Sequence, residues 1–368
     1  MTKQSMRLAV AAGALSLTMA GGVFAAANAE PTVAEPITSN APPGAKDNFD
    51  VYYNVCRGTD PRCYHPWVAP EDRDENGVRV LVYSRTAGPR HANLGTALTA
   101  GTNRQDSAGV VCTPPGPANN PCPALNANNV AQQALRTWLN AEGIQVDITE
   151  DVTRLSGLNQ YRAVIFMSPT RDTLWKHGTA VVPTSAVNTT TNAHLDAAKT
   201  ALRQYMRAGG GFVGIHNAFG TEYNWPYYEG LLGNANYYDH GANQPGTVYL
   251  TGSPDPSTQG LPSTWNTTDE WYNFQPYPTN VKFLVMLDET SLADRRETHP
   301  GHGNAHPVAW CQYYDGGRSW VTTLGHDRRQ FDGTPLPNGD PFPGQQAFKQ
   351  LVVQGIKSAM GLTPFCTK

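Results

Sequence analysis

Short apolar runs alternate with amphipathic stretches from residue 78 onward, and this alternation predicts an α/β fold. The runs typical of buried strands are rich in β-branched and aromatic residues and lie at 78–83, 144–149, 163–167, 212–215 and 281–287. The stretches with apolar residues at helical spacing lie at 128–143, 195–207 and 345–360. Strand, helix, strand, strand, helix, strand is the order of an open, mostly parallel sheet with helices on both faces.

Two later runs, 307–314 and 318–324, also have the pattern of strands. They are separated by Asp315, Gly316 and Gly317, and aspartate followed by glycine is a strong signal for a tight turn. The sequence therefore predicts a β-hairpin region added C-terminally to the parallel sheet.

The first 29 residues have the organisation of a cleavable secretory signal peptide. Lys3 and Arg7 precede an apolar run over 8–27, and the small residues Ala27 and Ala29 close that run at a peptidase-type site. An uncleaved membrane anchor is the alternative, but glycines dilute the run and a cleavage site follows it. We expect the mature chain to be secreted or periplasmic. No membrane association is expected after signal cleavage, because no other stretch is long and apolar enough to span a bilayer.

The remaining chain divides by composition. Residues 30–77 begin with a disordered leader rich in Pro, Ala, Thr and Asn and continue as an irregular extension that holds two cysteines. Residues 78–361 are expected to form one α/β domain, interrupted at 99–126 by an insertion rich in Gly, Pro and Asn. Residues 362–368 form a C-terminal tail.

All six cysteines follow the signal, and an even count in an exported chain predicts three disulfides. Short spacings favour two pairings and leave a third: Cys56–Cys63, Cys112–Cys122 and Cys311–Cys366. A metal site made of cysteines is the alternative, but the sequence has no C-x-x-C motif.

The net charge of the chain bears on its expected partners. Without the first 29 residues, 25 basic side chains oppose 30 acidic ones, which gives a net charge of −5. A mildly acidic chain has no electrostatic footprint for nucleic acid or for an anionic membrane surface, so we expect neither as a partner.

Four spaced segments resemble the ThuA-like (trehalose-utilisation) family: GGGFVGIHNA at 209–218, TDEWYNF at 268–274, HPVAW at 306–310 and GRSWVTTLGH at 317–326. The resemblance covers about 78–361 and implies a flavodoxin-like fold of the class I glutamine-amidotransferase-like superfamily. It also implies a link to the metabolism of disaccharides and keto-sugars, which makes a carbohydrate the expected partner. The N-terminal extension, the insertion at 99–126 and an Arg/His-rich segment at 293–304 depart from the family pattern.

Amidotransferases of that superfamily carry a nucleophilic cysteine at a strained G-x-C-x-G elbow after a strand. This chain has Gly214-Ile215-His216-Asn217-Ala218 there, so we expect no glutaminase activity. An elbow directs its side chain toward the ligand pocket of an open α/β sheet. His216 can therefore carry a proton or bind a metal, and a structural histidine bonded to the backbone is the alternative.

Asp269 and Glu270 stand side by side before Trp271 and Tyr272. Adjacent side chains of an extended segment point to opposite sides, so only one of the two acids is expected to face a given pocket. We select Glu270 as a general acid or base, with a surface acid or helix cap as the alternative.

Histidines at predicted loops or strand ends complete the candidate site, provided that the fold brings them together. The expected catalytic residues are His216, Glu270, His306 and His326. The same four residues are candidate ligands of a divalent metal, although no H-x-H or H-E-x-x-H spacing supports one locally. The expected substrate-binding residues are His91, Tyr223, Trp225, Trp271 and Trp310.

These features favour a secreted carbohydrate-active enzyme, a hydrolase, lyase or isomerase that acts on a sugar, glycoside or keto-sugar by acid/base chemistry. A non-catalytic carbohydrate-binding or surface-associated domain is the alternative. We expect at least three of the four catalytic candidates to line one cleft at the carboxyl edge of the parallel strands. We also expect Trp271, Trp310 or Tyr223 to lie in its wall.

Overall fold

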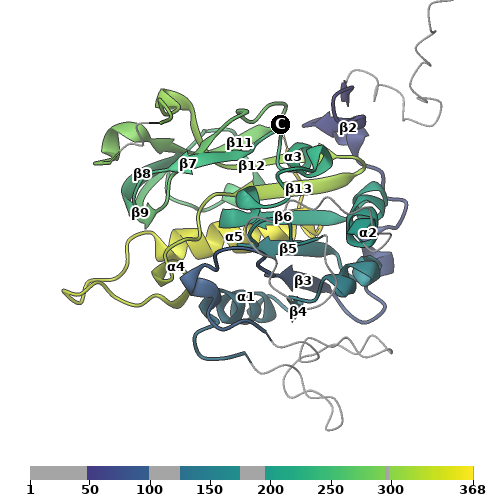
Figure 1. Ribbon diagram of the computed structural model, residues 1–368, viewed down its shortest axis with the longest axis horizontal. Coiled ribbons are helices and arrows are strands. Elements are labelled where there is room, and N and C mark those ends of the chain that lie inside the picture. The colour runs from purple at the N-terminus through teal and green to yellow at the C-terminus, as the bar shows by residue number, and fades with distance from the viewer. Residues whose placement is uncertain (1–47, 99–124, 175–194, 295–297, 368) are drawn as a thin grey trace, which may run out of the picture. The chain divides into compact units, whose positions relative to one another are not determined.

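The apolar runs of the sequence form the parallel half of one mixed sheet (Figure 1). The computed structural model describes residues 48–98, 125–174, 195–294 and 298–367. Five parallel strands lie in the order β4 (Gln145–Thr149), β3 (Arg79–Tyr83), β5 (Ala163–Met167), β6 (Gly211–Ile215) and β13 (Gly317–Thr322). The antiparallel half continues with β12 (His306–Tyr314), β11 (Lys282–Asp288), β8 (Gln244–Leu250) and β9 (Thr264–Asp269).

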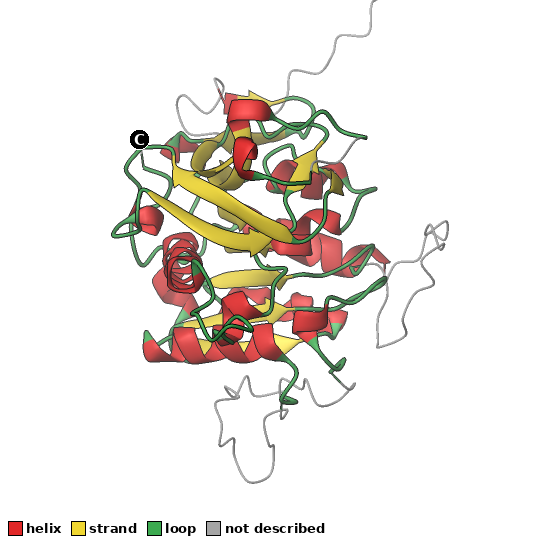
Figure 2. Cartoon of the chain, turned by 90° about the vertical axis from the view of Figure 1, so that its left-hand side faces the viewer, coloured by secondary structure: helices red, strands yellow, loops and turns green. Residues whose placement is uncertain are grey.

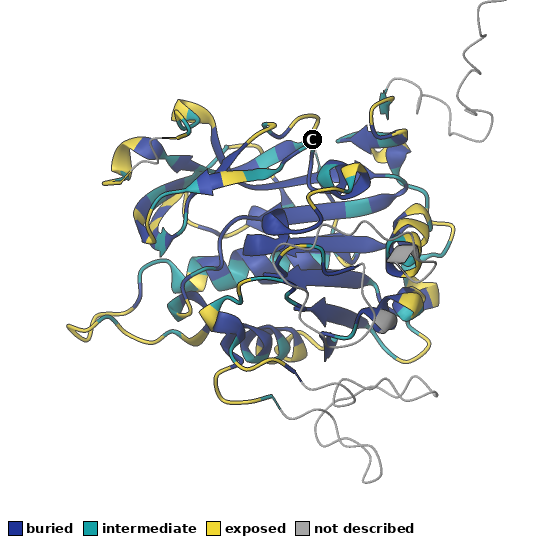
Figure 3. Ribbon diagram, viewed as in Figure 1, coloured by how far each residue is buried: buried dark blue, intermediate teal, exposed yellow. Residues whose placement is uncertain are grey.

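The expected α/β fold with a parallel sheet and helices is confirmed, and the two faces of the parallel strands enclose separate cores. On β3, Val80 and Val82 belong to one core, and Leu81 and Tyr83 belong to the other. Every residue of β3 is buried, which is what a parallel strand covered on both faces requires (Figure 3).

Helices cover both faces (Figure 2). The helices that contribute to the Val80 core are α1 (Val130–Ala141), α4 (Arg329–Asp332) and α5 (Gln345–Ala359). The helical elements that contribute to the Leu81 core include α2 (Leu195–Arg207), α3 (Pro226–Leu231) and the 3₁₀ segment η5 (Val152–Gln160). The remaining 3₁₀ segments of the described chain are η2 (Pro61–Cys63), η3 (Pro70–Arg73), η4 (Ala92–Leu94), η6 (His216–Gly220), η7 (Pro256–Thr258), η8 (Glu289–Ser291) and η9 (Gly303–Ala305).

The predicted hairpin exists as β12 and β13, but it is not an addition to the sheet. β13 pairs in parallel with β6 from Arg318↔Gly211 to Thr322↔Ile215, so the hairpin joins the two halves of the sheet. A second, two-stranded sheet pairs β7 (Tyr237–His240) with β10 (Tyr272–Phe274).

The N-terminal extension contains two short strands that its sequence pattern did not predict, β1 (Phe49–Asp50) and β2 (Val55–Gly58). β2 pairs with β12 and so joins the central sheet. The structure contains the disulfides Cys56–Cys63 and Cys311–Cys366. The expected signal peptide, most of the leader and the Cys112–Cys122 pair lie outside the described residues. None of the helices in the described ranges is long and apolar enough to cross a membrane.

Candidate functional site

His216 occupies the elbow that the motif predicts, directly after β6. Its backbone φ is 51°, a value that side chains other than glycine rarely adopt, and the residue is fully buried. Its Nδ1 donates to the Thr323 carbonyl oxygen at 2.9 Å. Its Nε2 lies 2.9 Å from the hydroxyl of Tyr272. The backbone bond fixes the ring, so the Nε2 edge is the one presented to the other polar side chains.

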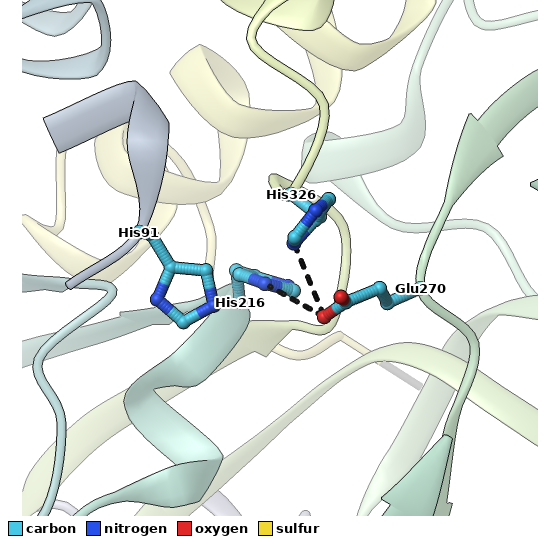
Figure 4. Close-up of side chains that lie close together, drawn as sticks. All are labelled: His91, His216, Glu270 and His326. Carbon is cyan, nitrogen blue, oxygen red and sulfur yellow. Dashed lines mark ion pairs between the residues drawn. The ribbon is translucent and has the colours of Figure 1, made fainter. Parts of the chain in front are cut away.

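Glu270 lies at the centre of a group of imidazoles (Figure 4). Its Oε2 is 3.1 Å from Nδ1 of His326, 3.5 Å from Nε2 of His240 and 3.7 Å from Nε2 of His216. His91 completes the group, with its ring centroid 4.8 Å from that of His216 and 5.6 Å from that of His326. Glu270, His91, His216 and His326 each place one potential ligand atom within 4.8 Å of the others.

The four side chains come from loops that follow different strands. His91 follows β3, His216 follows β6, Glu270 follows β9, and His326 follows β13. The strands β3, β6 and β13 are parallel, so their carboxyl ends meet at one edge of the sheet, where open α/β folds bind ligands. The elements therefore assemble the group from residues that lie far apart in the sequence.

The environment separates the protonation states of these groups. Burial lowers the pKa of His216 well below its usual value, and burial together with the charge of His326 lowers that of His91 to about 4. Burial alone would lower the pKa of His326, but the Glu270 carboxylate raises it. Burial alone would raise the pKa of Glu270, but His326 and the other histidines lower it. Glu270 and His326 thus each favour the charged form of the other.

Asp269 does not line the cleft but holds the turn beside the site. It is fully buried, and its carboxylate accepts hydrogen bonds from the backbone N–H groups of Glu270 at 2.8 Å, His326 at 3.2 Å and Gly325 at 2.8 Å. The side-chain amide of Gln330 donates a fourth at 2.9 Å. Burial raises the pKa of Asp269 to about 7, although the donated hydrogen bonds act in the opposite direction. Asp269 therefore holds the backbone of the turn that carries His326.

An open cleft of about 430 Å³ lies against Glu270, His91 and Tyr272. Aromatic side chains make up much of its remaining wall: Tyr223, Tyr237, Tyr238 and His240. Its other polar lining side chains are Thr170, Arg171 and Asn217. Tyr238 and Tyr223 are 46% and 37% exposed, which leaves ring surface available to a ligand. Of the four residues expected to be catalytic, Glu270 alone lines this cleft, so the expectation that at least three of them line it is not met. His216 and His326 contact Glu270 without being lining residues.

The structure brings together three of the four residues expected to be catalytic and corrects the fourth. His306 begins β12, where its pairing with Leu287 of β11 directs the residue toward the neighbouring turn η8. There its Nδ1 lies 2.7 Å from Oε1 of Glu289. It borders a different, smaller cavity together with Glu289 and His299. His306 is therefore a partner of Glu289 and belongs to neither the catalytic nor the metal-binding candidates.

Replacing Glu289 by glutamine is expected to lower the free energy of unfolding by about 2 kcal/mol at pH 7. Burial alone would raise the pKa of Glu289, but hydrogen bonds from His306 and from the backbone of His302 and Gly303 lower it from 4.5 to about 2. A lowered carboxyl pKa stabilises the fold fully above the unfolded value of 4.5. That contribution is lost as the pH falls toward 2. Urea titrations of both proteins across this range measure the difference, which should shrink with acidification; a constant difference would contradict the prediction.

The three tryptophans expected to bind substrate are not among the residues that line this cleft. Trp271 is buried on the opposite side of its segment from Glu270 and donates its indole N–H to the Gln244 carbonyl oxygen at 3.1 Å. Trp310 is fully buried in the core, where it donates to the Leu232 carbonyl oxygen at 2.8 Å. Trp225 stacks on Tyr227 and is not among the residues that line the cleft. Tyr223 and His91 do line it.

The sequence reasoning did not select Tyr272, His240 or Asp269 for the site. Tyr272 follows Glu270 by two positions, and side chains two apart in an extended segment share a face, so the signal for Tyr272 was present. His240 has no comparable signal, because only the pairing of β7 with β10 brings it beside Tyr272. Asp269 could be identified as the inward-facing acid, but its partners become visible only in the fold.

Solved structures with similar folds include two putative ThuA-like proteins. The one from Bacteroides uniformis has 20% sequence identity and a TM-score of 0.48 over 76% of this chain and 90% of its own. The one from Parabacteroides merdae has 15% identity and a TM-score of 0.46 over 77% and 90%. A putative GMP synthase protein from Thermoplasma acidophilum has 9% identity and a TM-score of 0.36 over 76% and 94%.

No curated protein matches the sequence. The family model for ThuA, described as trehalose utilisation, matches residues 123–336, which is more than half of the chain. The family resemblance expected from the four motifs is thus confirmed: the chain belongs to the ThuA family.

Proposed function

We propose that this chain is an exported enzyme that acts on a sugar, glycoside or keto-sugar in the cleft beside Glu270. The observation that carries the proposal is the convergence of His216 and His326 on Glu270, which lines that cleft, from segments far apart in the sequence. The trehalose-utilisation description of the family supports a sugar as the substrate class. The disulfides Cys56–Cys63 and Cys311–Cys366 support export, because disulfides persist in oxidising compartments.

The cleft has the size and lining of a small-ligand site. About 430 Å³ lies within the range of small-molecule pockets and accommodates one or two sugar rings. Exposed faces of Tyr223 and Tyr238 suit the apolar C–H faces of a pyranose. Arg171, Thr170 and Asn217 supply hydrogen-bonding groups that can orient the hydroxyls.

The acid/base groups favour elimination or isomerisation over hydrolysis by a pair of carboxylates. Glycosidases generally need two carboxyl groups that flank the scissile bond. Among the described residues that line this cleft, Glu270 is the single carboxylate. Proton removal beside a carbonyl needs one acceptor and one donor, and the set of Glu270, His240 and His326 provides both. A keto-sugar is the substrate that this chemistry fits best.

The test is to incubate the mature protein with native and oxidised disaccharides in D₂O and to follow products and deuterium uptake by NMR. We expect deuterium at the carbon next to the carbonyl of an oxidised sugar. Glu270→Gln should lower kcat/KM by about 10²-fold or more. Glu142→Gln, which alters an exposed acid paired with Lys357 far from the cleft, is the matched control and should be unchanged.

The alternative is a non-catalytic carbohydrate-binding domain. Saturable sugar binding that is lost in Tyr223→Ala, with no turnover of any sugar, would establish that alternative. If the protein neither binds nor turns over any sugar of the panel, both assignments are contradicted.

A further inference from the structure

We propose that His91, His216, Glu270 and His326 bind a divalent cation of the zinc class. This inference deepens the proposed function, since it concerns the same site, but its test does not depend on finding the substrate. Three imidazoles and one carboxylate form the donor set. Such a set suits zinc and its neighbours among the transition metals, whereas magnesium and calcium prefer oxygen ligands alone.

The spacing of the donor atoms fits a single ion. Zinc bonds of 2.0–2.1 Å in a tetrahedron place neighbouring ligand atoms about 3.3 Å apart. Oε2 of Glu270 is 3.1 Å from Nδ1 of His326 and 3.7 Å from Nε2 of His216, so the two separations bracket that value. All four ligand atoms lie within 4.8 Å of one another. Figure 4 shows His216 and His326 facing the Glu270 carboxylate, with His91 beside His216. Small side-chain rotations close the coordination sphere.

The contact between the partly buried Glu270 and His326 is itself unusual. Nδ1 of His326 is buried beside the Glu270 carboxylate at 3.1 Å, yet it makes no well-aligned hydrogen bond within the described part of the chain. Buried polar atoms normally have a partner, so an orphaned imidazole nitrogen next to a carboxylate requires an explanation. A cation between the two groups satisfies both.

The surrounding contacts are those that orient metal ligands. His216 donates its Nδ1–H to the Thr323 carbonyl oxygen, which leaves Nε2 with a lone pair. The Tyr272 hydroxyl lies 2.9 Å from this Nε2 and 3.4 Å from Oδ1 of Asn217, so binding of an ion requires that hydroxyl to donate to Asn217 alone. Asp269 accepts from the backbone N–H groups of Gly325 and His326 and fixes the turn that presents the His326 ring. Asn93, two residues after His91, donates to the Gly325 carbonyl oxygen at 2.5 Å and ties the His91 loop to the same turn.

The position of the site relative to the cleft connects it with the proposed chemistry. His91 and Glu270 border the cleft, so an ion between them can accept a sugar oxygen as a further ligand and stabilise charge that develops on it. His240 borders the cleft and lies 3.5 Å from the carboxylate without belonging to the four ligands. It is then the group left to exchange a proton with the substrate.

The experiment uses untagged mature protein that has been stripped with a chelator and titrated calorimetrically with Zn²⁺, Co²⁺, Mn²⁺ and Mg²⁺. We expect one equivalent of Zn²⁺ to bind and Mg²⁺ not to compete. The Co²⁺ form should show the visible absorption of a four- or five-coordinate ion. His326→Ala and Glu270→Gln should each weaken Zn²⁺ binding by about 100-fold or more.

The matched control is His299→Ala, which removes a histidine from the separate cavity beside Glu289. It should leave the Zn²⁺ affinity unchanged. Because His326→Ala could unfold, its circular dichroism is compared with that of the wild type, and His91→Asn gives a second, independent ligand variant. Absence of Zn²⁺ binding by the wild type, or equal binding by the folded ligand variants, overturns the inference.

The two proposals fail in different ways. One bound equivalent that is lost in the ligand variants, with no turnover of any sugar, would support the metal site and contradict the proposed enzyme. Sugar turnover by a protein that binds no Zn²⁺, Co²⁺ or Mn²⁺ would support the enzyme and overturn the metal site.

Discussion

Replacing Asp147 by alanine is expected to lower the free energy of unfolding by about 3–5 kcal/mol. Asp147 lies buried on β4, and its Oδ2 accepts hydrogen bonds at 2.6 Å from both Arg79 and the Tyr161 hydroxyl. Arg79 is fully buried on the neighbouring strand. Removal of the carboxylate leaves a buried guanidinium that still donates to the Gln160 side-chain oxygen but has lost its charge partner. Removing one partner is the costly way to break a buried ion pair.

Chemical denaturation of wild type and variant, analysed with a common slope, measures this loss. The double replacement Arg79→Met with Asp147→Leu removes this pair of charges. Arg154 also lies 3.9 Å from the Asp147 carboxylate and keeps its charge, so the double replacement should recover part of the stability. Glu142→Ala breaks an exposed ion pair with Lys357 and should cost less than about 1 kcal/mol. A loss below about 1 kcal/mol for Asp147→Ala would show that water reaches Arg79.

The same pair illustrates what the sequence could and could not predict about the fold. β3 was predicted because Val80 to Tyr83 are apolar, and a buried parallel strand needs apolar side chains on both faces. Arg79 begins the same strand, but its partner lies 68 positions away, and no local pattern joins the two. The pattern of apolar residues predicts which positions are buried, but it does not predict which distant residue will pair with a buried charge.

Two strands of the antiparallel half, β8 and β9, were missed for a related reason, whereas β11 and β12 were predicted as strands. Residues 244–250, which form β8, begin with Gln244, Pro245 and Gly246, and none of these favours a strand. Their strand conformation comes from pairing with β9 and β11 on either side. Tertiary pairing therefore overrides weak local preference there.

The site residues that were predicted correctly are those that follow a strand recognisable from its own sequence. The elbow positions His216, and the end of β13 positions His326, because each follows a strand with a clear apolar pattern. His306 also begins a strand, and it was misplaced because the direction of β12 and its pairing with β11 are tertiary properties. His240 was missed because only the pairing of β7 with β10 in the small second sheet brings it to the site.

Replacing Asp269 by asparagine is expected to lower the free energy of unfolding by about 3 kcal/mol and to weaken Zn²⁺ binding by about 10- to 100-fold. Oδ1 of Asp269 accepts from the backbone N–H groups of Glu270 and His326. Oδ2 accepts from the Gly325 N–H and the Gln330 side-chain amide. Asparagine has only one oxygen, so in either orientation its NH₂ group faces two donors.

The consequence for the site follows from which donors lose their partner. If the NH₂ group replaces Oδ2, the Gly325 N–H is left buried and unpaired. If the NH₂ group replaces Oδ1, the His326 N–H is left without an acceptor. Either change releases the turn whose backbone carries the His326 ring beside Glu270. Affinity should therefore fall although none of the four proposed ligands is altered, because outer contacts commonly contribute about 10- to 100-fold to metal binding.

Asp288→Asn is the matched control for this measurement. Asp288, like Asp269, is the last residue of a strand, and it accepts at Oδ1 from the Thr290 backbone N–H at 3.0 Å, but in an exposed turn. Asparagine caps such a turn about as well as aspartate, so stability should change by less than about 0.5 kcal/mol and Zn²⁺ affinity not at all. The Zn²⁺ titrations are carried out under conditions in which the denaturation curves show that each variant is folded. An Asp269→Asn protein that is destabilised but binds Zn²⁺ as the wild type does would assign the buried carboxylate to the fold alone and leave His326 to be positioned by its own packing.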